Sequence, residues 1–198
     1  MVGMEAYTAD PRLELEGGWL RQARRVPSPN YGARPEGCAP ELLVIHNISL
    51  PPGCYEGDCV ERFFSNRLDW EEHPWFAEIR GQQVSAHLLV RRDGELVQFV
   101  DFGERAWHAG LSHYAGRDNC NDFSIGIELE GTDDDPYTDM QYTALVAVTR
   151  ILLAGYPKLH RENIVGHSDI APGRKTDPGP AFDWHRYRQA LFANEENV

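Results

Sequence analysis

The continuous apolar run LLVIH, at Leu42–His46, is the feature that most limits how this chain can fold. The run is short and unbroken by polar residues, and the turn-forming sequence SLPPG follows it closely. Such a run is typical of a strand that is covered on both faces. A second strand is predicted over residues 123–131 (FSIGIELEG), where the period of two places Glu128 and Glu130 on the face opposite the isoleucines.

Two further segments predict strands. Residues 84–100 (VSAHLLVRRDGELVQFV) read as an antiparallel pair joined by a two-residue hairpin turn at Asp93 and Gly94. Residues 163–167 (NIVGH) read as a short strand. Because one hairpin is antiparallel while the other strands are separated by helical segments, the sequence indicates a mixed sheet.

The clearest helix signal covers residues 138–157. Thr138 and Gln141 have the spacing of a capping box, and apolar residues then recur at helical spacing. Residues 183–192 predict a final helix and residues 59–68 a short one. We therefore expect an α/β fold, with a single domain built on a mixed central β-sheet that is flanked by helices.

One domain is expected over residues 1–198. This length suits a single hydrophobic core, and no repeat or low-complexity linker divides the sequence. Residues 1–40 are rich in proline, glycine and arginine and predict an irregular N-terminal strap over the surface. Residues 194–198 are expected to form a tail.

Composition and charge exclude several partners. The formal net charge of −12 at pH 7 disfavours nucleic acid and anionic membrane, since both are polyanions. No stretch of about 18 apolar residues predicts a membrane span, and the first residues lack the pattern of a secretory signal. The four cysteines contain no C-x-x-C pair and are expected to be reduced thiols. We therefore expect a cytoplasmic protein, acting as a monomer.

A stiff stretch at 166–180, GHSDIAPGRKTDPGP, carries several ionisable residues between prolines and glycines. His46 ends one predicted strand and His167 another, and strand ends in α/β folds meet in a common crevice. A histidine in that position can equally be a hydrogen-bonded structural residue. Asp177 adds a carboxylate, and two imidazoles with one carboxylate and an open fourth position make a catalytic zinc site. The sequence thus predicts one Zn²⁺ per chain.

Asp169 is the alternative carboxylate ligand. It lies two residues after His167 and would have to turn back within one tight bend. Asp177 has a longer loop before it, with Gly173 for reversal, and Pro178 favours an extended conformation at Asp177. We therefore expect Asp177, and not Asp169, to complete the site.

Glu128 and Lys175 are candidate catalytic residues. A carboxylate in an apolar strand is costly unless it is paired or lies in a cleft, and zinc hydrolases use one to accept a proton from water. The alternative is that Glu128 lies on a solvated strand face. Lys175 lies two residues from Asp177 and could stabilise an oxyanion on a carbonyl, although most lysines are surface groups.

Five motifs in order resemble a known family. They are LLVIHNISLPPG, VSAHLLVRRDGELVQFV, RAWHAG, CNDFSIGIELEGTD and GHSDIAPGRKTDPGPAFDW. Together they resemble the bacterial zinc-dependent N-acetylmuramyl-L-alanine amidases, a family that includes the peptidoglycan recognition proteins. The similarity extends over nearly the whole chain.

This resemblance implies a function and the residues that carry it. Its zinc ligands match His46, His167 and Asp177, its acid/base glutamate matches Glu128, and its second catalytic residue matches Lys175. The implied reaction cleaves the amide between the lactyl group of N-acetylmuramic acid and L-alanine. The cytosolic members act on 1,6-anhydro muropeptides during cell-wall recycling, and thereby restrain induction of chromosomal β-lactamase.

The substrate-binding residues follow the resemblance less closely. Where the family carries arginines before VSAH and before the cysteine of CNDF, this chain has Gln83 and Asn119. Arg80 or Arg117 is expected to meet anionic groups of the ligand in their place.

The motif RAWHAG supplies the other expected substrate contacts. Trp107 and His108 are expected to line the groove, with the indole ring facing the sugar, although Trp107 could instead be a core residue. His87 is expected to support the site without binding the metal.

Three alternatives stay open at this point. The chain could be an amidase that acts on intact peptidoglycan, although no export signal is present. It could be a peptidoglycan-binding module that has kept the fold without catalysis. It could also be a scaffold whose zinc is closed by four protein ligands. Zinc content together with turnover of a muropeptide separates them.

Overall fold

The structure, a computed structural model, describes residues 13–193 and is built on one central sheet. The strands of this sheet are β3 (Arg24–Arg25), β5 (Leu42–Ile48), β6 (Leu88–Val90), β7 (Leu96–Gln98), β11 (Ser124–Glu130) and β12 (Ile164–Gly166). Their order is β12–β5–β11–β6–β7–β3. All neighbours are parallel except β6 and β7, which are antiparallel. The prediction of a mixed central sheet is therefore confirmed.

Strands β5 and β11 occupy the centre of the sheet because their sequences suit burial on both faces. All seven residues of β11 are buried, as are the first five of β5. The two strands pair in parallel over their whole length. Parallel strands covered by other layers on both faces carry continuous apolar runs, which is the pattern that the sequence shows.

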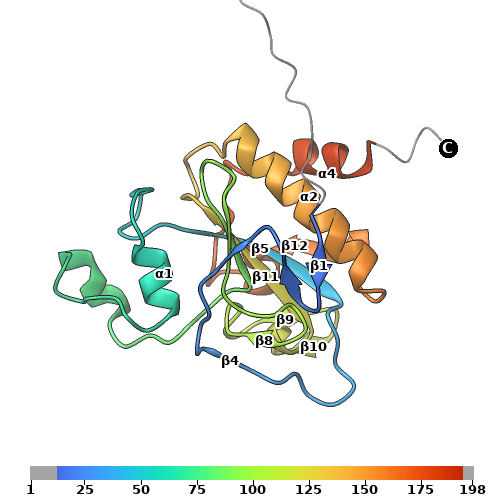
Figure 1. Cartoon of the computed structure of the whole chain (residues 1–198), viewed down its shortest axis with the longest axis horizontal. Coiled ribbons are helices and arrows are strands. Elements are labelled where there is room, and N and C mark those ends of the chain that lie inside the picture. The colour runs from blue at the N-terminus through green and yellow to red at the C-terminus, as the bar shows by residue number, and fades with distance from the viewer. Residues whose placement is uncertain (1–12, 194–198) are drawn as a thin grey trace, which may run out of the picture.

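Helices α2 (Asp139–Gly155) and α4 (Trp184–Phe192) cover one face of the sheet (Figure 1). Apolar side chains of α2 pack with those of β5, β6 and β11 in one core cluster. The predicted capping box of α2 is present, with Thr138 accepting from the backbone N–H of Gln141. Asp183 accepts from the N–H of Arg186 and so caps α4. Both predicted helices are confirmed.

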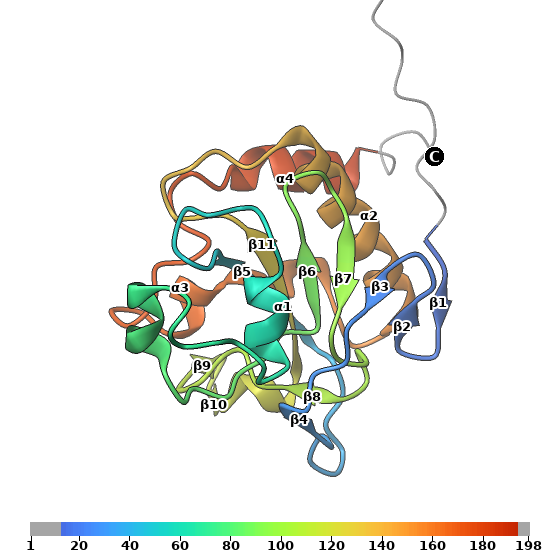
Figure 2. The same ribbon diagram turned by 60° about the vertical axis from the view of Figure 1, so that its left-hand side comes forward.

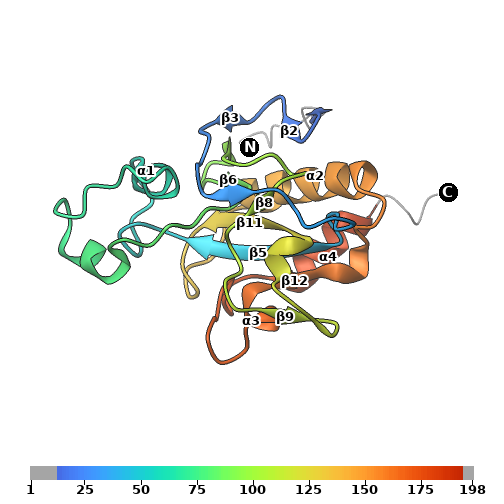
Figure 3. The ribbon, with the colours of Figure 1, turned by 90° about the horizontal axis from the view of Figure 1, so that it is seen from below.

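The second face is covered by shorter elements. Helix α1 (Cys59–Phe64) and the 3₁₀ helix η1 (Pro74–Ile79) extend away from α2 and α4 (Figures 1 and 3) and enclose an apolar cluster of their own against β6 and β7. Helix α3 (His167–Ile170) packs on the same face against β5, where Ile170 lies in one cluster with Leu42 and Val44. Figure 2 shows α1 in front of the sheet and α2 and α4 behind it.

The N-terminal segment is more ordered than the predicted irregular strap. β1 (Leu15–Glu16) pairs with β2 (Trp19–Leu20), and β3 pairs with β7 at the edge of the central sheet. Backbone groups on the outer edge of β7 need hydrogen-bond partners, and β3 supplies them. The sequence did not predict β3 because two residues are too few to show a periodic pattern. Residues 1–12 and the predicted tail 194–198 lie outside the described residues.

The remaining short elements connect the layers. They are β4 (Tyr31–Gly32), β8 (Arg105–Ala106), β9 (His113–Tyr114), β10 (Arg117–Asp118), η2 (Cys120–Asp122) and η3 (Arg161–Asn163). β4 pairs with β8, and β9 pairs with β10. Within residues 13–193, no helix is long and apolar enough to cross a membrane.

The predicted two-residue hairpin turn between β6 and β7 is wrong. The backbone N–H of Arg91 donates to Glu95 O, which leaves a three-residue loop, and the N–H of Gly94 also donates to Arg91 O. Gly94 has φ of 87°, a left-handed conformation that glycine adopts without strain. A turn followed by a glycine in that conformation is the common three-residue hairpin.

Candidate metal centre and active site

His46 and Glu128 project from the same face of the sheet. They are Cα partners in the parallel pairing of β5 and β11, and partners at one register position point their side chains the same way. The predicted faces of β11 are therefore confirmed. The prediction that His46 ends its strand is wrong, because β5 continues to Ile48. Both residues are buried, with exposures of 1% for His46 and 8% for Glu128.

His167 comes to His46 from the neighbouring strand. β12 pairs with β5 in parallel, with Gly166 opposite Ile45. The residues that follow these two, His167 and His46, therefore lie side by side. The prediction that His167 ends this strand is also wrong, because β12 ends at Gly166 and His167 begins helix α3. Asp169 accepts the backbone N–H of Gly166 at 2.7 Å and thereby closes the first turn of this helix.

The loop that carries Asp177 is tied to both histidine segments. The N–H of Ser168 donates to Asp177 O at 3.0 Å. The next carbonyl, Pro178 O, accepts from Asn47 Nδ2 at 3.2 Å and from the Tyr137 hydroxyl at 2.8 Å. These contacts hold the Asp177 side chain against the two imidazoles.

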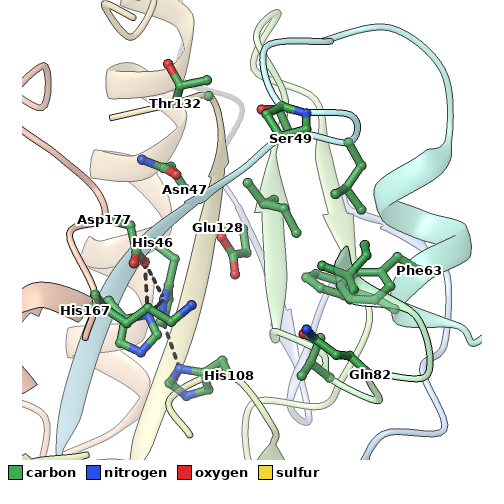
Figure 4. Close-up of a pocket in the computed structure, with 18 of the residues that line it drawn as sticks. His46, Asn47, Ser49, Phe63, Gln82, His108, Glu128, Thr132, His167 and Asp177 are labelled. Atoms are coloured by element: carbon green, nitrogen blue, oxygen red, sulfur yellow. Dashed lines mark hydrogen bonds and ion pairs between the residues drawn. The ribbon is translucent and has the colours of Figure 1, made fainter. Parts of the chain in front are cut away.

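Three ligand atoms converge at this point, as Figure 4 shows. His46 Nδ1 lies 3.0 Å from His167 Nδ1 and 3.0 Å from Asp177 Oδ2, and the third side of this triangle is 3.1 Å. Ligands of tetrahedral zinc at about 2.0–2.1 Å lie about 3.3 Å apart, so the triangle has the size of one face of such a site. His167 Nε2 donates to Ala109 O at 3.1 Å, which orients the ring with Nδ1 toward the other two candidate ligand atoms.

The pKa values of His46 and Asp177 suit metal binding. Burial lowers the pKa of His46 to about 4, so the imidazole is neutral at pH 7. Burial alone would raise the pKa of Asp177, but hydrogen bonds from His167 and His46 outweigh it and hold that pKa below its usual 3.8. A neutral imidazole and an ionised carboxylate are the forms in which these side chains coordinate a metal.

Glu128 is buried, and one of its carboxylate oxygens has no hydrogen-bond partner among the described residues. Within residues 13–193, Glu128 Oε2 is the buried side-chain polar atom that lacks a hydrogen-bond partner. Burial, and then repulsion from Asp177, raise the pKa of Glu128 well above its usual 4.5, while Lys175 lowers it. A buried carboxylate oxygen without a partner costs free energy, so its presence in one pocket with the triangle of candidate ligands, called the metal triangle below, indicates a role toward a bound molecule.

The triangle and Glu128 lie in one pocket of about 390 Å³. The three candidate metal ligands form one side, and α1 and η1 form the other with Phe63, Phe64, Trp75 and Ile79. Figure 4 shows Phe63 across the pocket from His46, with Glu128 between them. One polar side with titratable groups and one apolar side are common features of a small-molecule site.

Lys175 and Trp107 both line this pocket. Lys175 is exposed and stands on the same loop as Asp177, and Trp107 is half-buried. The placement agrees with the expectation that Trp107 lies in the groove rather than in the core. The catalytic role of Lys175 stays a prediction.

His108 also lines the pocket, but it lies behind His46. His108 Nδ1 is 2.8 Å from His46 Nε2, on the side of the ring that faces away from the metal triangle. His87 is fully buried, and its nitrogens contact backbone atoms of Gly126 and Glu104. The geometry therefore gives His87 no direct contact with the triangle.

Arg117 and Arg80 lie outside the residues that line the pocket. Arg117 pairs with Glu41 at 2.7 Å, and its guanidinium lies 3.8 Å from the centroid of the Phe123 ring. Arg80 pairs with Glu71 on the surface. Both cations already have a carboxylate partner, so their contact with a substrate stays a prediction without structural support.

The two positions that depart from the family pattern are also exposed. Gln83 follows the pocket residue Gln82, and Asn119 adopts a positive φ of 56° before η2. Asparagine tolerates this left-handed conformation better than most residues do.

Asn47, Ser49 and Asp133 line the pocket although sequence reasoning did not single them out. Asn47 Nδ2 donates to Asp133 Oδ1 at 2.8 Å, which joins the end of β5 to the loop after β11. The sequence gives one indirect signal, namely that Asn47 follows the candidate ligand His46. The partner of Asn47 is 86 residues away, so its role is visible only in three dimensions.

The chain belongs to the N-acetylmuramoyl-L-alanine amidase family, whose profile matches residues 36–180. Among its relatives is the 1,6-anhydro-N-acetylmuramyl-L-alanine amidase AmpD of Escherichia coli (strain K12). It is 62% identical over 174 residues, which cover 88% of this chain and 94% of the relative.

Solved structures support the same assignment. A crystal structure of a selenomethionine derivative of AmpD superposes with a TM-score of 0.88 and 57% identity, over 90% of this chain and 99% of that one. A more distant structure is the N-acetylmuramyl-L-alanine amidase AmiD from E. coli, in complex with the substrate anhydro-N-acetylmuramic acid-L-Ala-D-gamma-Glu-L-Lys. It has a TM-score of 0.56 and 32% identity, and the match covers 79% of this chain and 60% of that one.

Proposed function

We propose that this protein is a zinc-dependent amidase that hydrolyses the bond between the lactyl group of 1,6-anhydro-N-acetylmuramic acid and L-alanine in muropeptides. The observation that carries the proposal is the convergence of three ligand atoms and the unpartnered Glu128 Oε2 in one pocket. The high identity to AmpD enzymes supports the anhydro-muropeptide as the substrate. The AmiD complex with an anhydro-muropeptide supports a ligand of this class for the fold.

The residues present fit a zinc ion. His46 Nδ1, His167 Nδ1 and Asp177 Oδ2 are imidazole and carboxylate donors of the kind that catalytic zinc sites use, and they leave one position open. We assign these three residues as the ligands of one zinc ion per chain. When bound, zinc supplies Lewis-acid polarisation of a water molecule and of the scissile carbonyl.

We assign Glu128 as the general base, because it is buried in the same pocket as the three candidate ligands. Its buried oxygen accepts a proton from the attacking water as the new C–O bond forms at the lactyl carbon. The C–N bond then breaks, and Glu128 passes the proton to the alanine nitrogen, which leaves as a neutral amine. The raised pKa of Glu128 suits the second transfer because it makes the protonated carboxyl accessible during turnover.

Lys175 and Trp107 complete the assignment. Lys175 lines the pocket, where its side chain can donate to the oxyanion that develops on the lactyl carbonyl oxygen. Trp107 offers an aromatic face to the sugar. His108 remains in the set of candidate substrate contacts, since it lines the same pocket.

The cellular role follows from the substrate. An enzyme of this kind removes peptides from anhydro-muropeptides during cell-wall recycling, and we propose that it works in the cytoplasm and thereby limits β-lactamase induction where that circuit exists. The four cysteines, all within the described residues, are free thiols, which is common in a reducing compartment. The monomeric state stays a prediction.

The decisive experiment measures zinc content and product formation on one purified sample. Zinc-loaded protein should release peptide from anhydro-muropeptide, chelation should abolish this, and added zinc should restore it. Full turnover in a verified metal-free sample would overturn the metal assignment. Equal or faster turnover of intact peptidoglycan would favour the wall-degrading alternative, and binding without turnover would favour a recognition module.

A further inference from the structure

The second nitrogen of His46 is held by a chain of side chains that the proposed chemistry does not use. His46 Nε2 lies 2.8 Å from His108 Nδ1, and His108 Nε2 lies 3.0 Å from Ser124 Oγ. Ser124 is fully buried, and Ser124 Oγ is the one hydrogen-bond partner of His108 Nε2 among the described residues. The chain thus runs from the metal triangle to the first residue of β11.

The sheet provides a seat for the middle ring of this chain. A Cβ added to Gly126 would lie 2.4 Å from the His108 ring, which is closer than real contacts allow. The ring therefore lies directly against the backbone of β11, where any larger residue at position 126 would displace it. The N–H groups of His108 and Ala109 both donate to Asn121 Oδ1, at 3.1 and 2.8 Å, and fix the backbone of this segment.

We propose that His108 is a positioning residue for the metal ligand His46, and that Ser124 ends this chain of hydrogen bonds by accepting from His108 Nε2–H when the metal is bound. The proposal rests on the proposed function only in that it takes His46 Nδ1 as a zinc ligand.

With a metal on His46 Nδ1, the proton of the neutral ring must be on Nε2. That N–H donates to His108 Nδ1, which requires the His108 proton on Nε2, and this second N–H donates to Ser124 Oγ.

Without a metal, the same atoms allow the opposite direction. His46 Nδ1–H donates to Asp177 Oδ2, which is 3.0 Å away, His108 Nδ1–H donates to His46 Nε2, and the Ser124 hydroxyl donates to His108 Nε2. The first direction suits the metal-bound site, and the second suits the metal-free site, because Asp177 Oδ2 accepts and so needs a proton on His46 Nδ1. Metal binding therefore selects one tautomer of His108, although His108 does not touch the metal.

The experiment compares variants that differ in what they offer to His46 Nε2. His108→Leu removes the acceptor, whereas His108→Asn keeps a side-chain oxygen at the same distance from the backbone as Nδ1. Loss of a hydrogen-bond partner of a metal ligand typically lowers affinity by about 10–100-fold. We expect His108→Leu to weaken zinc binding by about that factor in a chelator competition assay, His108→Asn to stay within about threefold of wild type, and Ser124→Ala to fall between them.

The controls separate this role from general stability. Ser28→Ala removes another buried hydroxyl, which donates to Phe64 O outside the metal triangle, and should leave zinc affinity unchanged. Thermal unfolding of each metal-free variant shows whether it folds. Zinc affinity of His108→Leu equal to that of wild type in a folded sample would overturn the proposal.

A spectroscopic readout tests the relay directly. Ring ¹⁵N shifts of the wild-type protein should show the His108 proton on Nδ1 without metal and on Nε2 with zinc. A zinc-loaded protein with the His108 proton on Nδ1 would contradict the relay. Neither readout involves muropeptide turnover, so a protein that shows the relay but no hydrolysis would refute the proposed function and leave this inference standing.

Discussion

His46 and Glu128 are Cα partners at one register position of the parallel strands β5 and β11, although they lie 82 positions apart in the sequence. Because the two strands share one register, the candidate metal ligand and the candidate base point from the same face into the same pocket. A shift of one residue in this pairing would turn one of the two side chains to the opposite face. The chemistry of the site therefore depends on the register of the central strand pair.

The first prediction follows from this pairing. Glu128→Gln should keep zinc and lower kcat by about 10²–10⁴-fold, because the amide cannot accept the proton of the attacking water. The matched control is Glu130→Gln on the same face of β11, which accepts from the Arg92 N–H and pairs with Arg91 at 3.4 Å. This control should lose stability but keep most activity. A large kinetic defect in Glu130→Gln alone would show that the general base is misassigned.

The raised pKa of Glu128 predicts a pH-dependent stability of the metal-free protein. The folded state holds a proton on Glu128 above the usual pKa of 4.5, whereas the unfolded state releases it there. The contribution of Glu128 to stability is thus fully present below pH 4.5 and is lost as the pH rises toward the folded-state pKa. Glu128→Gln has no such loss.

Denaturant unfolding of the metal-free proteins checks this. The stability of Glu128→Gln relative to wild type should increase as the pH rises from about 4.5, by up to about 1.4 kcal/mol per pH unit while the pH lies between the two pKa values. A difference that does not change between pH 4.5 and 8 would mean that Glu128 titrates normally.

Lys175 is one of two lysines in the chain, which gives a clean comparison. Lys175→Ala should lower kcat by about 10²–10³-fold with a smaller change in KM, because an oxyanion donor acts after charge has developed. Lys158→Ala is the control, since Lys158 is exposed and lies 3.7 Å from Glu41, outside the pocket. A pure KM effect of Lys175→Ala would indicate that it binds a ground-state group such as a peptide carboxylate.

The two aspartates after His167 have different structural tasks, and their variants should separate. Asp177→Ala removes an atom 3.0–3.1 Å from both histidines and should abolish tight zinc binding and activity. Asp169→Ala removes a cap on the Gly166 N–H, which typically costs about 1 kcal/mol of stability, and should retain zinc. Zinc stoichiometry of the two purified variants distinguishes them, and metal loss in Asp169→Ala with a replete Asp177→Ala would reverse the assignment.

Zinc should also stabilise the fold, because the three ligands join three separate segments of the chain. Thermal unfolding should shift to higher temperature with zinc in wild type, since binding only to the folded state adds to its stability. The shift should be absent in Asp177→Ala. An equal shift in that variant would place the zinc elsewhere.

The sequence alone determined the features that depend on neighbours along the chain. The alternation in residues 123–131 separates Glu128 from the isoleucines because side chains in a strand point to opposite faces with a period of two. The capping box at Thr138 and Gln141 marks the start of α2 because its hydrogen bonds span three residues. The sequence also shows the residue types of the candidate site. They are a histidine in an apolar strand, and a histidine and an aspartate in a stiff loop.

The tertiary structure decided what depends on distant segments. The motif RAWHAG predicted only that His108 lines a groove. In the structure, His108 Nδ1 lies 2.8 Å from Nε2 of His46, which is 62 positions earlier in the chain. Arg117 could be offered as a substrate ligand, but the fold pairs it with Glu41, 76 positions away. β3 joins the central sheet through backbone hydrogen bonds to β7. A strand of two residues is too short to show an alternating pattern in the sequence. Contacts of this kind are set by strand order and packing, and a local sequence pattern holds no information on which segments the sheet brings together.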